Sequence, residues 1–187
     1  MRKALVVGID YYEKSSPLYG CVNDAYAVKN VLERHSDGTI NFSVNLLTST
    51  GATNAISRKH LKEQVVELFK DDSDIALIYF SGHGYIESTG GYLITSECSD
   101  GDDGLATDDL LTIANKSPAR NKIIILDSCH SGIAGTPNNT DNKALLNEGV
   151  TILTASSATQ YAIEENGSGV FTSLLVDALN GSVANLV

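Results

Sequence analysis

Two short segments of the sequence combine residue types that could support nucleophilic catalysis. The segment "SGHGY" at residues 81–85 contains His83 between two glycines, and "DSCHSG" at residues 127–132 contains Cys129 followed by His130. A free thiol has a pKa of about 8.5, so it needs a base to become an effective nucleophile at neutral pH. An imidazole can accept that proton and later protonate a leaving amine. We therefore predict that His83 and Cys129 form a catalytic dyad.

Each of these segments follows an apolar run that is typical of a buried parallel strand, at residues 75–80 and 122–127. In open α/β sheets, ligands bind beyond the carboxyl ends of the strands. If the two strands are parallel and adjacent, His83 and Cys129 lie at the same edge of the sheet. The backbone amides of Gly84 and Cys129 are then candidates for stabilising an oxyanion.

The other cysteines and histidines have simpler interpretations. Isolated cysteines are most often inert packing residues, and this interpretation applies to Cys21 and Cys98. His130 is the alternative base, but neighbouring residues at a turn generally point apart, so it ranks below the histidine of "SGHG". His35 and His60 lie on expected helices among charged residues, and we expect them to face solvent.

The elements that must position the dyad follow an alternating pattern. Five segments have the composition of strands, at residues 3–9, 42–48, 75–80, 122–127 and 150–156. Four segments have apolar residues at helical spacing, at residues 23–35, 53–70, 106–115 and 169–181. Asn23 or Asp24 and Thr53 are the candidate N-caps of the first two helices. The alternation predicts an α/β fold with a central, mostly parallel sheet between two helical layers.

Composition restricts the class of protein. The chain has 187 residues, 42% hydrophobic and 19% charged, which predicts a single globular domain over residues 1–187. The net charge of −10 argues against nucleic acid or an anionic membrane surface as a partner. No apolar run is long enough for a transmembrane helix. Three cysteines suit free thiols in a reducing compartment, so we expect a cytoplasmic protein.

Four motifs, in matching order, resemble the caspase-like cysteine peptidases. They are "KALVVGIDYY", "LYGCVNDAYAVKNVL", "YFSGHG" and "LDSCHSG". Within that group the chain is most similar to the metacaspases and related bacterial caspase-family proteins, over residues 3 to about 180. The resemblance implies a caspase-like three-layer fold and cysteine endopeptidase activity. It also implies that Cys129 is the nucleophile and His83 the general base and acid.

The resemblance also implies a substrate preference. Caspases carry Gln-Ala-Cys-x-Gly around the nucleophile, whereas this chain has Asp127-Ser128-Cys129. Metacaspases bind a basic P1 residue, which supplies the carbonyl under attack, in a pocket lined with carboxylates. The matching positions are Asp24, Ser81 and Asp127, with Cys21 at the rim, and carboxylates suit Arg or Lys. The simpler interpretations are a helix N-cap for Asp24 and a turn residue for Asp127.

We expect an enzyme without a cofactor, and dependence on calcium is the open alternative. Metacaspases often need calcium, and the loop "SECSDGDDGLATDD" at residues 96–109 is rich in carboxylates. It supplies Asp100, Asp102, Asp103, Asp108 and Asp109. The spacing is not that of an EF-hand, and acidic loops are usually solvated surface.

The carboxyl-terminal end and the activation of the protein give further expectations. The family fold usually has a sixth strand after the last helix, and no residue follows Val187 to supply it. We therefore expect a domain that is truncated or processed at that end. Family members are often switched on by a partner protein or by cleavage, and Lys143 in the loop at residues 134–149 is a candidate cleavage point.

Two alternatives to a peptidase stay open at this stage. The first is a catalytically silent caspase-like module that scaffolds or regulates a partner, and the second is a small-molecule hydrolase using the same dyad. The intact histidine and cysteine favour a peptidase, because a scaffold has no need to keep both.

Overall fold

A computed structural model describes residues 1–100, 103–128, 146–155, 164–165 and 168–182. Its central sheet has five parallel strands in the order β2-β1-β3-β7-β8. These strands are β1 (Arg2–Ile9), β2 (Ser43–Ser49), β3 (Ile75–Ser81), β7 (Asn121–Asp127) and β8 (Val150–Thr154). All five strands predicted from the sequence are present, with ends that differ by at most a few residues.

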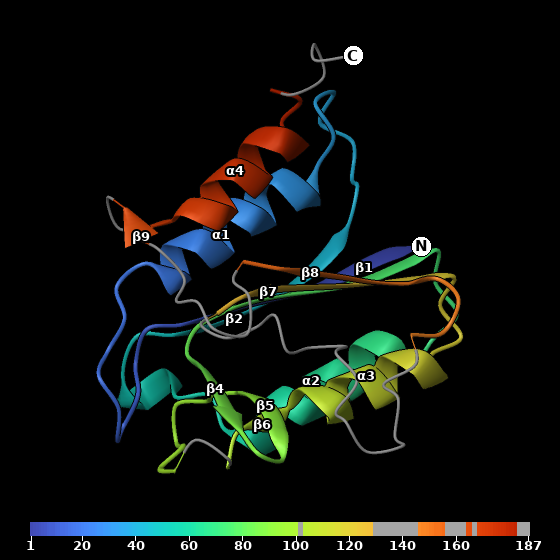
Figure 1. The fold of residues 1–187 in the computed structure, drawn as a ribbon. Helices are drawn as coiled ribbons and strands as arrows, with labels where there is room; N and C mark the ends of the chain where they lie inside the picture. Colours follow the sequence, from blue (N-terminus) through green and yellow to red (C-terminus); the bar gives the residue numbers. More distant parts are fainter. Residues whose placement is uncertain (101–102, 129–145, 156–163, 166–167, 183–187) are drawn as a thin grey trace.

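Helices cover both faces of this sheet. Figure 1 shows α1 (Cys21–Glu33) and α4 (Val170–Leu179) on one face, and α2 (Arg58–Phe69) and α3 (Thr107–Lys116) on the other. This arrangement confirms the predicted three-layer α/β fold. It follows from right-handed crossovers, which place successive connecting helices against the sheet.

The strands of the sheet centre bury side chains on both faces. Along β1, Leu5 and Val7 pack in the core under α2 and α3, whereas Ala4 and Val6 pack in the core under α1 and α4. Side chains alternate across a strand, so a strand covered on both faces needs apolar residues at successive positions. This requirement explains the continuous apolar runs in the sequence.

The pairing of β3 with β7 determines where the site forms. The two strands are parallel neighbours, and Ser81 at the end of β3 lies opposite Asp127 at the end of β7. The expectation that these strands end side by side is therefore confirmed. The carboxyl ends of both strands lie at one edge of the sheet, to the left in Figure 1.

A small antiparallel sheet that the sequence analysis did not predict follows His83 directly. It consists of β4 (Gly84–Glu87), β5 (Gly90–Leu93) and β6 (Leu105–Ala106). A two-residue turn connects β4 to β5, and Gly90 after that turn has a φ of +136°, a conformation that favours glycine. This hairpin forms one wall beside His83. A second short hairpin, of β9 (Glu164–Glu165) and β10 (Ser168–Gly169), precedes α4.

The predicted N-cap of the second helix is wrong. Thr53 lies in a short 3₁₀ helix, η1 (Ala52–Asn54), and α2 begins only at Arg58. Ser57 is the N-cap, and its hydroxyl accepts a hydrogen bond of 3.1 Å from the His60 backbone N–H. Both threonine and serine can cap a helix, so composition alone did not distinguish the two positions.

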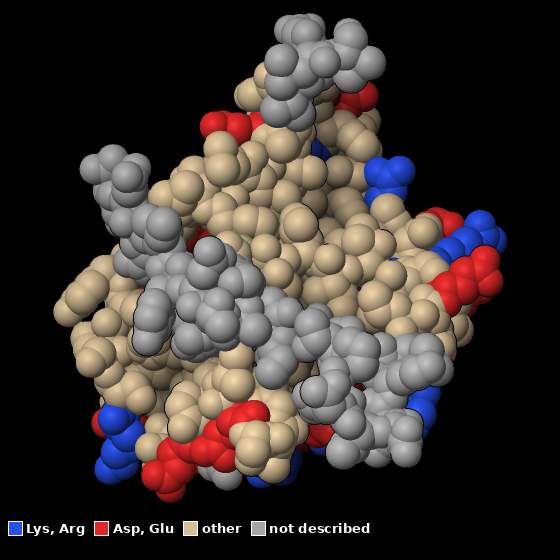
Figure 2. Space-filling model, viewed as in Figure 1, with Lys and Arg blue, Asp and Glu red and all other residues tan. Residues whose placement is uncertain are grey.

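The described residues show where the surface charges lie, how long the helices are and where two of the cysteines lie. On the face in Figure 2, charged side chains lie mainly around the margins and uncharged residues fill the described part of the centre. Across the residues that the structure describes, no helix combines the length and the apolarity that a bilayer span requires. Cys21 and Cys98 are both buried.

Candidate active site

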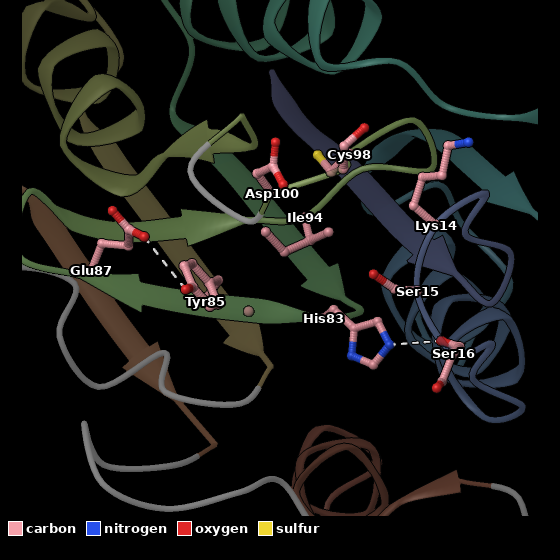
Figure 3. A pocket seen from close by; sticks show the side chains of 11 residues that line it. Lys14, Ser15, Ser16, His83, Tyr85, Glu87, Ile94, Cys98 and Asp100 are labelled. Carbon is pink, nitrogen blue, oxygen red and sulfur yellow. Dashed lines mark hydrogen bonds between the residues drawn. The ribbon is translucent and has the colours of Figure 1, made fainter.

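His83 is held by contacts at its backbone and at its ring. Its backbone N–H donates a 2.8 Å hydrogen bond to the Tyr12 hydroxyl, and its ring Nε2 lies 2.9 Å from the Ser16 carbonyl oxygen. A carbonyl can only accept, so Nε2 carries the proton and Nδ1 is left as the basic nitrogen. Figure 3 shows Nδ1 on the side of the ring away from Ser16. The imidazole is therefore held with Nδ1 as the nitrogen that can accept a proton.

Tyr12 supports this geometry from the core. Its ring centroid lies 4.5 Å from that of His83 at an interplanar angle of 48°. Burial raises the pKa of the Tyr12 hydroxyl well above its usual value, so the group stays protonated. A Cβ on Gly82 would lie 2.7 Å from the Tyr12 oxygen. Gly82 therefore makes room for the Tyr12 hydroxyl.

The Gly84 amide is oriented away from the hairpin that contains it. Gly84 pairs with Leu93 in the antiparallel ladder, and the neighbouring Ile94 N–H donates to the His83 carbonyl at 3.0 Å. Hydrogen-bonded and non-hydrogen-bonded pairs alternate along such a ladder. The N–H of Gly84 consequently points away from β5, and Gly84 lines the cavity beside His83.

The first helix is capped from another element, which corrects the sequence prediction. The Asp10 carboxylate, directly after β1, accepts hydrogen bonds from the N–H groups of Cys21 (3.0 Å) and Val22 (3.4 Å). Burial raises the pKa of Asp10, and these two hydrogen bonds partly oppose that shift. Neither Asn23 nor Asp24 is the N-cap, because Gly20 occupies that position. Asp24 instead turns inward from the first turn of α1.

Asp24 and Asp127, called the acidic pair below, converge on the first turn of α4. They are 2% and 6% exposed. The Gly169 N–H donates to both Asp24 oxygens, at 3.1 and 3.0 Å, and the Thr172 hydroxyl donates to Asp127 Oδ2 at 2.6 Å. A Cβ on Gly169 would lie 2.6 Å from Asp127 Oδ2 and 3.0 Å from Asp24 Oδ2. Both carboxylates therefore lie against the same glycine.

The surroundings of the acidic pair favour two negative charges. Adjacent buried carboxylates normally repel, so that one of them holds a proton. Here the donors come from the amino-terminal end of α4, whose helix dipole also stabilises anions. The pKa of the nearby Tyr79 is raised, first by burial and then by the charges of Asp127 and Asp24. The hydroxyl of Tyr79 consequently stays protonated beside the pair.

The two other predicted pocket residues lie next to the acidic pair. Ser81 is buried and is the strand neighbour of Asp127. Cys21 is buried in the first turn of α1, three residues before Asp24, a spacing that places both on one side of the helix. The structure thus brings together all four residues that the sequence analysis assigned to a substrate pocket. His83 lies at the same edge, two residues beyond Ser81.

A cavity of about 790 Å³ opens beside His83. The loop at residues 14–16, the hairpin β4–β5 and residues 98–100 form its walls (Figure 3). Both signs of charge line it, from Lys14, Glu87 and Asp100, together with serine hydroxyls. The cavity therefore gives an extended polypeptide space beside His83.

The aspartates proposed for calcium do not gather in the part of the chain that the structure describes. Asp103 accepts a 2.7 Å hydrogen bond from the Ser99 N–H, and Asp109 pairs with Lys62 at 2.7 Å. Those described residues contain no group of three or more His, Cys, Asp or Glu side chains placed to hold a metal ion. Asp102 lies outside them, so the calcium alternative stays untested.

Several predicted and missed residues complete the account of the site. Cys129, His130 and Lys143 lie outside the described residues, and the role of Cys129 stays a prediction. Five further residues position the site and were not predicted from the sequence, namely Asp10, Tyr12, Ser16, Gly169 and Thr172. Only Asp10 had a local signal, because an aspartate directly after a buried strand and shortly before a helix can cap that helix.

Comparisons with known proteins agree with this architecture. Residues 1–186 match the caspase domain family. Metacaspase-4 of Arabidopsis thaliana is 28% identical over 70% of this chain and 34% of its own length. Metacaspase-6 of the same plant is 31% identical over 70% of this chain and 38% of its own length. Metacaspase-1 of Debaryomyces hansenii is 27% identical over 99% of this chain and 43% of its own length.

A solved structure shows the same fold. The crystal structure of caspase-1 from Spodoptera frugiperda superposes with a TM-score of 0.71 and 15% identity, covering 96% of this chain and 69% of that chain. At that identity the likeness concerns the fold. The chain spans less than half the length of the curated relatives described above.

Proposed function

Because the chain belongs to the caspase domain family, we propose that it is a cysteine endopeptidase that cleaves proteins after arginine or lysine, using His83 and Cys129. One observation carries this proposal. The acidic pair is buried at the edge of the sheet where β3 leads to His83 and β7 leads toward the Cys129 position. Two buried carboxylates favour a cationic ligand, and a guanidinium can bind both at once.

The reaction begins with proton transfer from the Cys129 thiol to Nδ1 of His83. The thiolate sulfur attacks the carbonyl carbon of the P1 residue, and the C–S bond forms as the carbonyl oxygen becomes an oxyanion. His83 then protonates the amine nitrogen as the C–N bond breaks. Water then gives a proton to Nδ1 of His83 as its oxygen attacks the thioester carbon, and the C–S bond breaks as His83 returns the proton to the Cys129 sulfur. The Ser16 carbonyl holds Nε2–H throughout, which keeps Nδ1 available as the working nitrogen.

Backbone amides stabilise the negative charge that develops on the carbonyl oxygen. The Gly84 N–H, which points away from β5, is one donor, and the Cys129 N–H is the second. Backbone donors of this kind are fixed before the reaction, so they need little rearrangement when the charge appears.

A panel of fluorogenic peptides that differ only at P1 tests the proposal. Peptides with Arg or Lys at P1 should be hydrolysed, while those with Asp or Leu should not. If the peptide with Asp at P1 were the best substrate, the assignment of the acidic pair to the P1 pocket would be wrong, even if the dyad is correct. Hydrolysis of none of the four, with calcium or with a chelator, would favour the silent scaffold. Comparing hydrolysis in calcium with hydrolysis in a chelator also tests whether the enzyme needs calcium.

Replacing Tyr12 with phenylalanine should lower kcat for a P1-Arg peptide by roughly tenfold. The change removes the acceptor of the His83 N–H but keeps the ring that packs against the imidazole. Leaving a buried N–H without a partner costs about 1–3 kcal/mol, enough to displace the residue that carries the base. Steady-state kinetics and a thermal melt of the same variant measure the effect.

Tyr11→Phe is the matched control, since the Tyr11 hydroxyl has no hydrogen-bond partner among the described residues. It should leave both kcat and the melting temperature nearly unchanged. If Tyr12→Phe lowers only the melting temperature, Tyr12 contributes to stability and does not position His83.

A further inference from the structure

A network of buried hydroxyl groups ends on one member of the acidic pair. The Tyr79 hydroxyl lies 2.5 Å from the Thr172 hydroxyl, which lies 2.6 Å from Asp127 Oδ2. Tyr79 and Thr172 are both 0% exposed, so water does not compete for these hydrogen bonds. The three residues come from β3, α4 and β7, and their contacts join the layer of α1 and α4 to the central sheet.

The direction of these hydrogen bonds follows from the chemistry of the groups. An ionised carboxylate only accepts, so the single proton of the Thr172 hydroxyl is donated to Asp127. Toward Tyr79 the Thr172 oxygen can then only accept, which makes the Tyr79 hydroxyl the donor. Every proton of the network therefore points toward Asp127.

This direction has a consequence for the charge and the orientation of Asp127. Successive hydroxyls that donate in one direction polarise each other, and a charge-assisted bond at the end is stronger than a neutral one. Protonating Asp127 at Oδ2 would turn that oxygen into a donor and break the order of the network, and protonating it at Oδ1 would remove the charge that strengthens the bond from Thr172. The network therefore opposes protonation, although Asp24 is close by. The hydrogen bond to Oδ2 also fixes the orientation of the Asp127 carboxylate.

We propose that Thr172 and Tyr79 are positioning residues for substrate specificity, which hold Asp127 ionised and oriented toward the basic P1 side chain. This inference rests on the proposed function above. It predicts that removing either hydroxyl weakens recognition of positive charge at P1 and leaves the chemical step at His83 unaffected. An ordinary core hydrogen bond would instead affect stability and all substrates alike.

The test compares two peptides that differ only in the charge of P1. One carries arginine, and the other carries citrulline, which has the same shape without the charge. The measured quantity is the charge preference, defined as kcat/KM for the arginine peptide divided by kcat/KM for the citrulline peptide. Thr172→Val keeps the shape of the side chain and removes the hydroxyl. It should lower the charge preference about tenfold through a higher KM for arginine, with kcat within threefold of wild type.

Rescue and control variants separate positioning from packing. Thr172→Ser restores the hydroxyl and should return the charge preference to within threefold of wild type. Tyr79→Phe removes the more distant hydroxyl and should lower the charge preference about threefold, and it tests the network even if Thr172→Val does not fold. Ser173→Ala is the control, because its hydroxyl bonds the Gly169 carbonyl at 3.1 Å and reaches neither aspartate. It should leave the charge preference unchanged.

Each outcome decides one proposal or both. A wild-type protein with equal kcat/KM for the two peptides refutes the proposed function, and this inference with it. A wild-type preference for arginine that Thr172→Val and Tyr79→Phe leave unchanged refutes this inference alone. An equal loss for both peptides also refutes it, because the hydroxyls would then contribute only to the fold.

Discussion

Cys129→Ala and His83→Ala are each expected to lower kcat/KM for a P1-Arg peptide by on the order of 10³- to 10⁴-fold. The first variant removes the nucleophile, and the second removes both the base that activates it and the acid that protonates the leaving amine. Residues that act as one unit show strongly non-additive losses. The double variant should therefore be about as inactive as either single variant. Steady-state kinetics on the fluorogenic peptide measures all three.

Other histidines of the chain provide the controls for this prediction. His60→Ala changes an exposed residue of α2 and should leave kcat/KM unchanged. His130→Ala tests the alternative base, and we expect a loss of no more than about tenfold. A loss for His130→Ala as large as that for His83→Ala would show that the imidazole held by Ser16 is not the base.

The sequence predicted the central sheet well because each of its strands leaves a local signal. A strand covered on both faces needs consecutive apolar residues, and the runs ending at Ser81 and Asp127 have this composition. The β4–β5 hairpin was missed because its strands are short and contain glycine, which breaks the apolar pattern. The start of α1 was misplaced because its cap, Asp10, belongs to the end of β1.

Some residues of the candidate site could be predicted from the sequence, and others depend on contacts between distant segments. His83, Gly84 and Cys129 follow strand ends, so position and type alone indicated them, whereas the four pocket residues were assigned through the family resemblance. The supporting residues act across long separations: Tyr12 lies 71 residues from His83, and Gly169 lies 145 residues from Asp24. No pattern within a segment encodes such contacts. In the sequence, Thr172 is an ordinary polar residue of a helix, and only the fold brings its hydroxyl to Asp127.

Specificity for a basic P1 residue should depend on the charge of the acidic pair and not only on its shape. Asp24→Asn and Asp127→Asn are the appropriate changes, because each asparagine keeps an oxygen that can accept from Gly169 or Thr172. Removing one partner of a buried charge pair costs about 2–5 kcal/mol. Each variant should therefore lower kcat/KM for a P1-Arg peptide by on the order of 10²- to 10³-fold.

Combining each variant with the citrulline peptide isolates the charge interaction as a double-mutant cycle. Hydrolysis of the citrulline peptide should change by less than about tenfold, since no charge pair exists to be lost. Asp177→Asn makes the same charge change on the exposed surface of α4 and should leave both substrates unaffected. Equal losses for arginine and citrulline would mean that the aspartates maintain the fold of this edge and do not bind P1. Because the acidic pair is made by α1 and β7 against α4, that outcome would move the specificity site elsewhere along the same edge of the sheet.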